Sequence, residues 1–250
     1  MRRSRCNARA RSSEAFTMDQ PDPAGTGGPQ EPGRPSNPPA FNIPAVIVGL
    51  TLAIVIIQLL MSWSLGSGNR IHAVALWLGA VRTGATADQF PPAPLFGLTP
   101  YVLHAFLHFG WMHTLVNAGA LIAFGSAAAR PFGAGLRGAA GFLAFYCACA
   151  ISGAVLSSLV HWGEASLMVG ASTAVSGLVP AAGWAFGGSR LMWRLALPWL
   201  GVNAALALAE PFVQHSIAWE GHVGGILMGM AAYPLFLAVF GPRAGRDAPG

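Results

Sequence analysis

Six apolar stretches, each long enough to cross a bilayer, constrain this chain more than any other feature of its sequence. They cover residues 43–63, 106–129, 138–160, 169–187, 191–209 and 219–240. A helix needs roughly 20 residues to cross about 30 Å of hydrocarbon, and backbone groups in lipid must form their hydrogen bonds within their own segment. The sequence therefore predicts an all-α membrane protein built as a bundle of six transmembrane helices.

Charged residues are too scarce for a soluble protein of this size. They make up 9% of the 250 residues, hydrophobic residues make up 54%, and the mean hydropathy is +0.53. A typical soluble domain carries about 25% charged residues. The formal charge of +5 does not indicate nucleic acid as a partner, because the arginines are spread along the chain and form no patch. The lipid bilayer is the expected partner of this surface.

The two ends of the chain differ in composition from the part that carries the apolar stretches. Residues 1–41 are rich in Pro, Gly, Ser and Arg and contain no apolar run of helix length, which predicts a disordered cytosolic tail. The Arg- and Ser-rich opening also permits a mitochondrial transit peptide as the alternative. Residues 42–242 form the predicted membrane domain, and residues 243–250 form a short cytosolic tail.

The distribution of arginine predicts the orientation of the helices. With the basic tail inside, six spans put the second and fourth links and the C-terminus on the same side. These segments hold Arg130, Arg137, Arg190, Arg194, Arg243 and Arg246, whereas the short outer links hold Glu164, Glu210 and Glu220 and no arginine. Arg70 and Arg82, in the long first outer segment, are exceptions to the rule that basic residues lie on the inner side. We expect both termini in the cytoplasm, in a bacterial inner membrane.

Strongly polar residues interrupt three of the apolar stretches near the same predicted depth. His113 and Asn117 lie near the start of the second span, Ser172 near the start of the fourth, and His222 near the start of the sixth. These three spans run in the same direction, so their starts lie near the outer face. Polar groups within spans are costly and usually functional. We therefore expect the four residues to form one site.

Small residues provide a way to bring Ser172 and His222 together. Gly221, Gly225 and Gly229 recur at every fourth position, and such a strip lets a second helix approach closely. We expect close packing of the fourth and sixth spans, with Ser172 within hydrogen-bond reach of His222. His222 then acts as general base, Ser172 as nucleophile, and His113, Asn117 and the Ser172 N–H as oxyanion donors. No carboxylate is expected within a span to orient His222, so the constellation is a dyad.

Other intramembrane chemistries lack their residues. All four aspartates lie outside the predicted spans, and the sequence contains no HExxH zinc signature. His104, His108 and His113 form a cluster without an acidic or fourth ligand, and Cys147 and Cys149 point to different sides of a helix. His72, His161 and His215 lie in the predicted outer links and are expected to be interfacial. Neither a metal nor a cofactor is predicted.

The sequence resembles the rhomboid family over residues 42–242. The matching pieces are FLHFGWMHTLVN, GASTAVSG and GHVGG, in that order. The resemblance implies a rhomboid-like six-helix bundle and an intramembrane serine endopeptidase. It assigns Ser172 as nucleophile, His222 as base, and His113 with Asn117 as oxyanion donors. It also implies transmembrane protein substrates, a cavity open to outside water, and no cofactor.

The sequence departs from the family pattern at three places. Thr173 follows the nucleophile where glycine is usual, and a β-branched residue there is expected to restrict the backbone or narrow the cavity. Thr99-Pro100 stands where a Trp-Arg pair is common, so the first outer segment must be held differently. Ser176 stands where an aromatic residue often stacks on the histidine.

Two rival functions are weighed against the protease. A catalytically inactive rhomboid-like protein would bind membrane helices without cutting them, and Thr173 is the motif-level feature that favours it. A small transporter would use the buried histidines as proton carriers. The transporter predicts internal repeats or broken helices near the midplane, and the sequence contains neither.

Overall fold

The computed structural model describes residues 42–67, 70–212 and 217–242. The two predicted tails, residues 1–41 and 243–250, lie outside these ranges, as does His215 in the last predicted outer link.

Within the described residues, five helices are long and apolar enough to cross a membrane. They are α1 (Ala45–Ser67), the stretch Trp111–Phe132, α8 (Leu136–Val160), α9 (Ser172–Ala209) and α10 (Trp219–Phe240). The second of these runs without interruption through α6 (Trp111–Ala120), a π-helical turn η2 (Leu121–Gly125), α7 (Ser126–Ala129) and a 3-10 turn η3 (Arg130–Phe132). The prediction of an α-helical membrane protein is confirmed.

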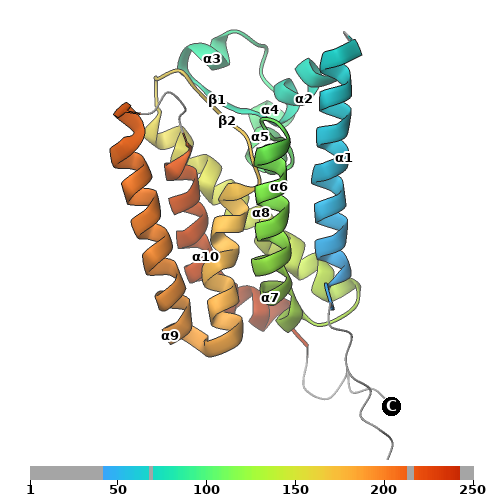
Figure 1. Cartoon of the computed structure of the whole chain (residues 1–250), viewed down its shortest axis with the longest axis vertical. Coiled ribbons are helices and arrows are strands. Elements are labelled where there is room, and N and C mark those ends of the chain that lie inside the picture. Colours follow the sequence, from blue (N-terminus) through green and yellow to red (C-terminus); the bar gives the residue numbers. More distant parts are fainter. Residues whose placement is uncertain (1–41, 68–69, 213–216, 243–250) are drawn as a thin grey trace, which may run out of the picture. The chain divides into compact units, whose positions relative to one another are not determined.

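Helix α9 folds back on itself. It spans 38 residues, but Gly187 and Gly188 leave the helical region, and the φ of +61° at Gly188 favours glycine. Trp199 Nε1 lies 3.1 Å from Ser176 Oγ, 23 residues earlier, whereas a straight helix would separate them by about 35 Å. Figure 1 shows the two legs side by side. They coincide with the predicted fourth and fifth spans, although α9 counts as one of the five long helices, so the number of six spans stays a prediction.

Helix α10 packs against α8 and against the first leg of α9. A Cβ on Gly225 would lie 1.9 Å from Thr173 O, and one on Gly229 would lie 2.2 Å from Gly177 O. These two glycines therefore let the backbones approach as far as they do. The close packing that the glycine spacing predicts for this helix pair is confirmed.

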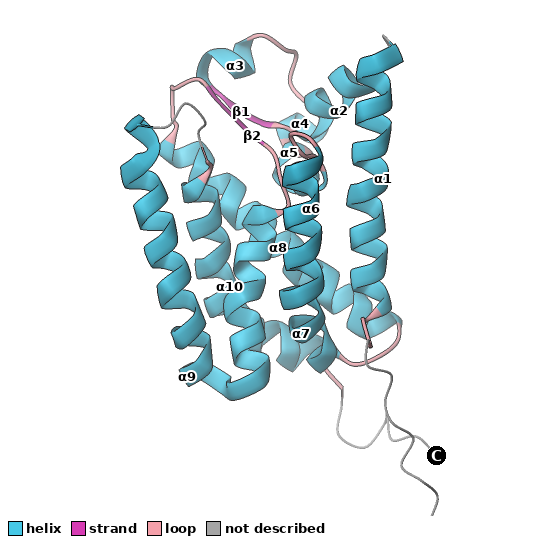
Figure 2. Cartoon of the chain, in the orientation of Figure 1, coloured by secondary structure: helices cyan, strands magenta, loops and turns pink. Residues whose placement is uncertain are grey.

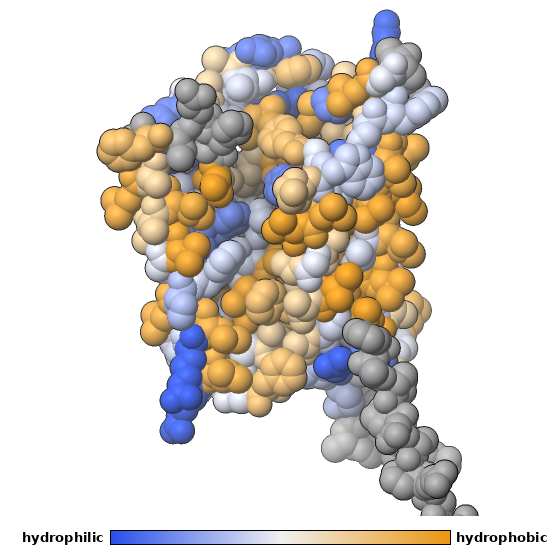
Figure 3. Space-filling model, in the orientation of Figure 1, coloured by the Kyte–Doolittle hydropathy of each residue, from blue (hydrophilic) through white to orange (hydrophobic). Residues whose placement is uncertain are grey.

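Large apolar side chains cover much of the outside of the bundle. On α1, Leu52, Ile56 and Leu59 are each at least half exposed. Figure 3 shows apolar residues over the faces of the helices visible in that view. Such an apolar exterior is costly in water and suits a lipid environment.

Short elements at one end of the bundle include a small sheet that the sequence did not predict. Strand β1 (Val81–Thr83) pairs antiparallel with β2 (Ser166–Met168), with Val81 opposite Met168, and Figure 2 shows both strands at that end. Around β1 lie α2 (Ile71–Gly79), α3 (Gly84–Asp88), α4 (Pro94–Gly97), α5 (Pro100–Leu103) and the 3-10 turn η1 (His104–Phe106). Strand β2 leads directly to the start of α9, so the sheet anchors the residues before Ser172.

Backbone carbonyls hold the first outer segment where the Trp-Arg pair is missing. Thr99 Oγ1 donates to Leu78 O at 2.8 Å, and Trp77 Nε1 donates to Pro91 O at 3.0 Å. Arg82 Nη2 donates to Trp77 O at 3.2 Å. These three hydrogen bonds hold the segment in this protein.

Candidate active site

The four residues singled out in the sequence line one cavity. Ser172 is the first residue of α9, His222 lies in the first turn of α10, and His113 and Asn117 lie on α6. The cavity has a volume of about 410 Å³. Its walls are largely apolar and include Phe109, Val116, Met168, Val175, Trp199 and Ile217. A polar cluster in an apolar pocket of this size is typical of a ligand or substrate site.

Gly170 brings the ring of His113 and the hydroxyl of Ser172 to the same place. Its φ is +131°, a region that side chains disfavour. A Cβ on Gly170 would lie 2.9 Å from His113 Nε2 and 3.4 Å from Ser172 Oγ. The absence of this side chain leaves the two groups facing one small space.

Backbone and side-chain hydrogen-bond donors lie near Ser172 at this cavity. The N–H of Ser172 lies at a helix start, where backbone N–H groups have no partner within the helix. Asn117 Nδ2 donates one hydrogen to His113 O at 2.9 Å, and an amide nitrogen carries two. The second hydrogen of Asn117 and the ring of His113 are the side-chain donors that the sequence predicts.

His104 and His108 hold the loop before Ser172, a role that the sequence did not reveal. The N–H of Gly170 donates to His104 O at 2.9 Å, and the N–H of Ala171 donates to His108 Nε2 at 3.2 Å. Within the described part of the chain, no group of His, Cys, Asp or Glu could hold a metal. No helical spacing signals this role, because the 3-10 turn ends at Phe106 and His108 lies beyond it.

Thr173 points away from the cavity. Its hydroxyl donates to His104 Nε2 at 3.0 Å, and His104 Nδ1 donates to Pro100 O at 2.8 Å. A Cβ on Gly153 or Gly221 would collide with Cγ2 of Thr173, so these two glycines make room for the branched side chain. Burial lowers the pKa of His104 to about 4, which keeps the ring neutral and able to accept this bond. The expectation that Thr173 narrows the cavity is wrong, because its side chain packs between α8 and α10.

His222 is held by a residue that the sequence analysis missed. His222 Nδ1 lies 2.8 Å from Asn203 Oδ1, in the second leg of α9. Asn203 is a polar residue within a predicted span, the same signal that singled out the other four residues. Among the described residues Ser172 Oγ makes no hydrogen bond, and the predicted bond to His222 is therefore not formed in this state. Catalytic hydrogen bonds are often long in unliganded enzymes and shorten with substrate bound.

A comparison with protein families identifies the architecture around this cavity. The family model of the rhomboid domain matches residues 96–239, which is more than half of the chain, and the four predicted site residues lie within this range. The chain belongs to the rhomboid family. No curated protein matches it.

Ser176 stands at the rhomboid position where an aromatic residue is often found, and it has a different partner here. Its hydroxyl accepts a hydrogen bond from Trp199 Nε1 at 3.1 Å. Both residues line the cavity. The indole of Trp199, from the second leg of α9, therefore places an aromatic group in the part of the cavity wall where the side chain of Ser176 is small.

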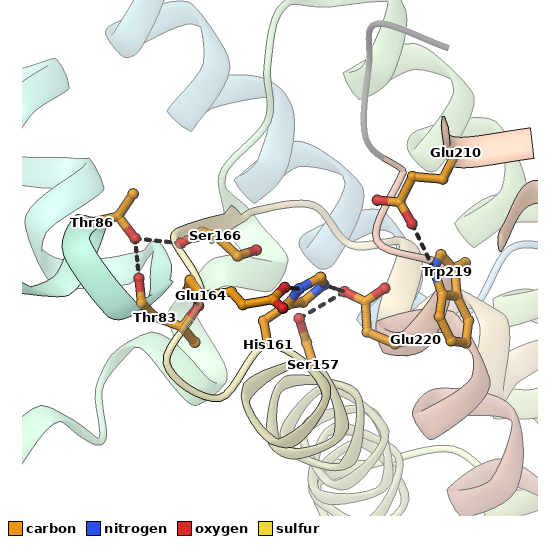
Figure 4. Close-up of polar contacts among 9 residues, drawn as sticks. All are labelled: Thr83, Thr86, Ser157, His161, Glu164, Ser166, Glu210, Trp219 and Glu220. Carbon is orange, nitrogen blue, oxygen red and sulfur yellow. Dashed lines mark hydrogen bonds and ion pairs between the residues drawn. The ribbon is translucent and has the colours of Figure 1, made fainter. Parts of the chain in front are cut away.

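A carboxylate lies inside a long helix of this rhomboid chain, contrary to the sequence-based expectation. Glu220 is in the first turn of α10 and 2% exposed. Its Oε1 accepts a hydrogen bond from Ser157 Oγ at 2.8 Å and lies 3.3 Å from His161 Nε2, as Figure 4 shows. The described residues show no hydrogen bond from Glu220 to His222. Glu220 therefore joins the ends of α8 and α10 and does not complete a triad.

Proposed function

We propose that this rhomboid protein is an intramembrane serine endopeptidase that cuts transmembrane segments of other proteins. The observation that carries the proposal is the single cavity lined by Ser172, His222, His113 and Asn117. A nucleophile, a base and oxyanion donors are the parts that acyl transfer requires. They come together there from three helices.

The chemistry follows from the roles of these groups. His222 Nε2 takes the proton of the Ser172 hydroxyl while Oγ attacks the scissile carbonyl, and the oxyanion is stabilised by Asn117, His113 and the Ser172 N–H. The tetrahedral intermediate collapses when His222 returns the proton to the leaving amine. Water then hydrolyses the acyl-enzyme by the same steps. Each well-placed oxyanion donor contributes about 3 kcal/mol to stabilising the transition state.

The proposed setting follows from the distribution of charge and apolar surface. Six segments cross the bilayer, with the two legs of α9 as the fourth and fifth, and both termini lie in the cytoplasm of a bacterial cell. The starts of α9 and α10 then lie near the outer face. Substrates reach the cavity as membrane-embedded protein segments, and the reaction needs no cofactor.

The test is cleavage of a single-span reporter substrate by purified protein in liposomes. We expect the wild type to cleave it and Ser172→Ala to be inactive. Ser126→Ala is the matched control, because Ser126 lies in α7 away from the cavity and its buried hydroxyl has no hydrogen-bond partner. Cleavage by pure Ser172→Ala at the wild-type rate would refute the proposal.

A catalytically inactive rhomboid-like protein that binds membrane helices is the second candidate. The observation that favours it is the missing hydrogen bond between Ser172 and His222. A fluorophosphonate probe separates the two functions, because it reacts with an activated serine without needing a substrate. Labelling of the wild type and not of His222→Ala supports the protease, whereas absence of labelling in both supports the inactive protein.

A further inference from the structure

The side chain of Asn203 contacts the edge of the His222 ring that carries Nδ1. Asn203 Oδ1 and His222 Nδ1 are 2.8 Å apart. Asn203 is fully buried and is not among the residues that line the cavity, while His222 is 8% exposed and does line it. Water therefore does not compete for this hydrogen bond.

The direction of the Asn203 amide is fixed by its second contact. Asn203 Nδ2 donates to Trp199 O, one helical turn earlier, at 2.8 Å. The opposite orientation would place the amide oxygen against this carbonyl, and two acceptors repel. Oδ1 therefore faces His222, and an amide oxygen can only accept.

The contact determines which nitrogen of His222 carries the proton. Because Oδ1 accepts, Nδ1 must be the N–H, and Nε2 keeps its lone pair. A general base at this position needs that lone pair to take the proton of Ser172. We propose that Asn203 is a positioning residue that holds His222 in the tautomer required for proton transfer, an inference that rests on the proposed function.

An amide suits this place better than a carboxylate would. When Nε2 takes the proton, the ring becomes positive and the bond from Nδ1–H to Oδ1 strengthens. The neutral amide gives this support without adding a second buried ion, whose desolvation is costly. Asn203 thus takes the position of the third group that orients the base in serine and cysteine proteases.

The first test reads the tautomer directly and needs no cleavage. Protein carrying ¹⁵N-histidine is measured by NMR in detergent at about pH 8, and the His222 signals are assigned from their loss in His222→Gln. We expect Nδ1–H for the wild type and a shift toward Nε2–H, which free histidine prefers, in Asn203→Leu. An Nε2–H wild type, or an unchanged tautomer in Asn203→Leu, would overturn the inference.

The second test separates positioning from general stability. Asn203→Leu should lower kcat about 10- to 100-fold with KM within about twofold. Gln58→Leu is the matched control: it removes another buried amide, which in α1 donates to Ser62 Oγ at 3.1 Å and is not among the residues that line the cavity. Its kcat should stay within about twofold of wild type.

A kcat of Asn203→Leu within about twofold of wild type would overturn the role of Asn203. Failure of the wild type itself to cleave or to react with the probe would instead refute the proposed function, and the tautomer measurement would still decide about Asn203.

Discussion

The hydroxyl of Thr173 donates to Nε2 of His104 at 3.0 Å, which ties the residue after the proposed nucleophile to the turn His104–Phe106. His104 is fully buried and Thr173 is 1% exposed. The residue that departs from the family pattern thus has a partner of its own and lies outside the cavity lining. Glycine at this position could not make the contact.

Thr173→Val should destabilise the protein by about 1–3 kcal/mol, because it leaves the buried His104 Nε2 without a donor while conserving shape. The measurement is thermal or denaturant unfolding in detergent. Thr51→Val is the matched control, since the hydroxyl of Thr51 on α1 is buried without a hydrogen-bond partner; its removal should be neutral or slightly stabilising. Equal losses in both variants would contradict the role of the Thr173 bond.

Stability should fall as the pH falls from about 6.5 to about 4, the interval between the ordinary pKa of His104 and its value in the folded protein. In this interval the unfolded chain binds a proton that the folded chain excludes, so acid favours unfolding by up to about 1.4 kcal/mol per pH unit for this group. Unfolding of wild type and His104→Gln over this range is the measurement, and the variant should show a shallower dependence. Identical slopes would show that His104 is not responsible.

Gly225→Ala should destabilise the bundle by about 3 kcal/mol or more, because the new Cβ would lie 1.9 Å from Thr173 O and force α9 and α10 apart. The control is Gly49→Ala on α1, where a Cβ meets nothing within 4 Å. That change should stabilise the helix by about 0.5–1 kcal/mol. Unfolding of the two variants gives the comparison, and a Gly225→Ala protein as stable as wild type would contradict the observed helix packing.

Gly170→Ala should lower the cleavage rate at least about tenfold, since its Cβ would lie 2.8 Å from the His113 ring in the space next to Ser172. Gly110→Ala separates collision from backbone strain: Gly110 also has a positive φ, of +86°, but a Cβ there meets nothing within 4 Å. Rates of probe labelling and of cleavage are measured for both variants. If the two lose activity equally, backbone strain and not the collision with His113 explains the effect.

The sequence predicted the parts of this molecule that depend on repeated signals. Long apolar runs and a four-residue glycine spacing predicted the helices and the contact of α9 with α10, and polar residues at one depth predicted the lining of the cavity. The sequence did not reveal the contacts between individual side chains. Asn203 meets His222 only because α9 turns at Gly187–Gly188, and Thr173 meets His104 across 69 residues of chain.

The sequence analysis also did not predict the small sheet or the burial of the Glu220 carboxylate. Strands β1 and β2 have three residues each, too few to display an alternating pattern. Glu220 was assigned to an outer link because its side chain is acidic. Its burial depends on Ser157 and His161 at the end of α8.

The pairing of β1 with β2 determines where the chain tolerates a change of length. Residues 84–99 leave the sheet after β1, and none of the residues lining the cavity comes from this range. An epitope tag or a fluorophore-carrying peptide inserted after Gln89, between the contacts of Thr86 with Ser166 O and of Pro91 with Trp77, would lengthen a connection without moving the nucleophile. Between β2 and Ser172 lie three residues, and one additional residue there would displace the serine by about 3.3 Å. A single inserted residue at this point should therefore abolish the chemistry while the fold stays intact.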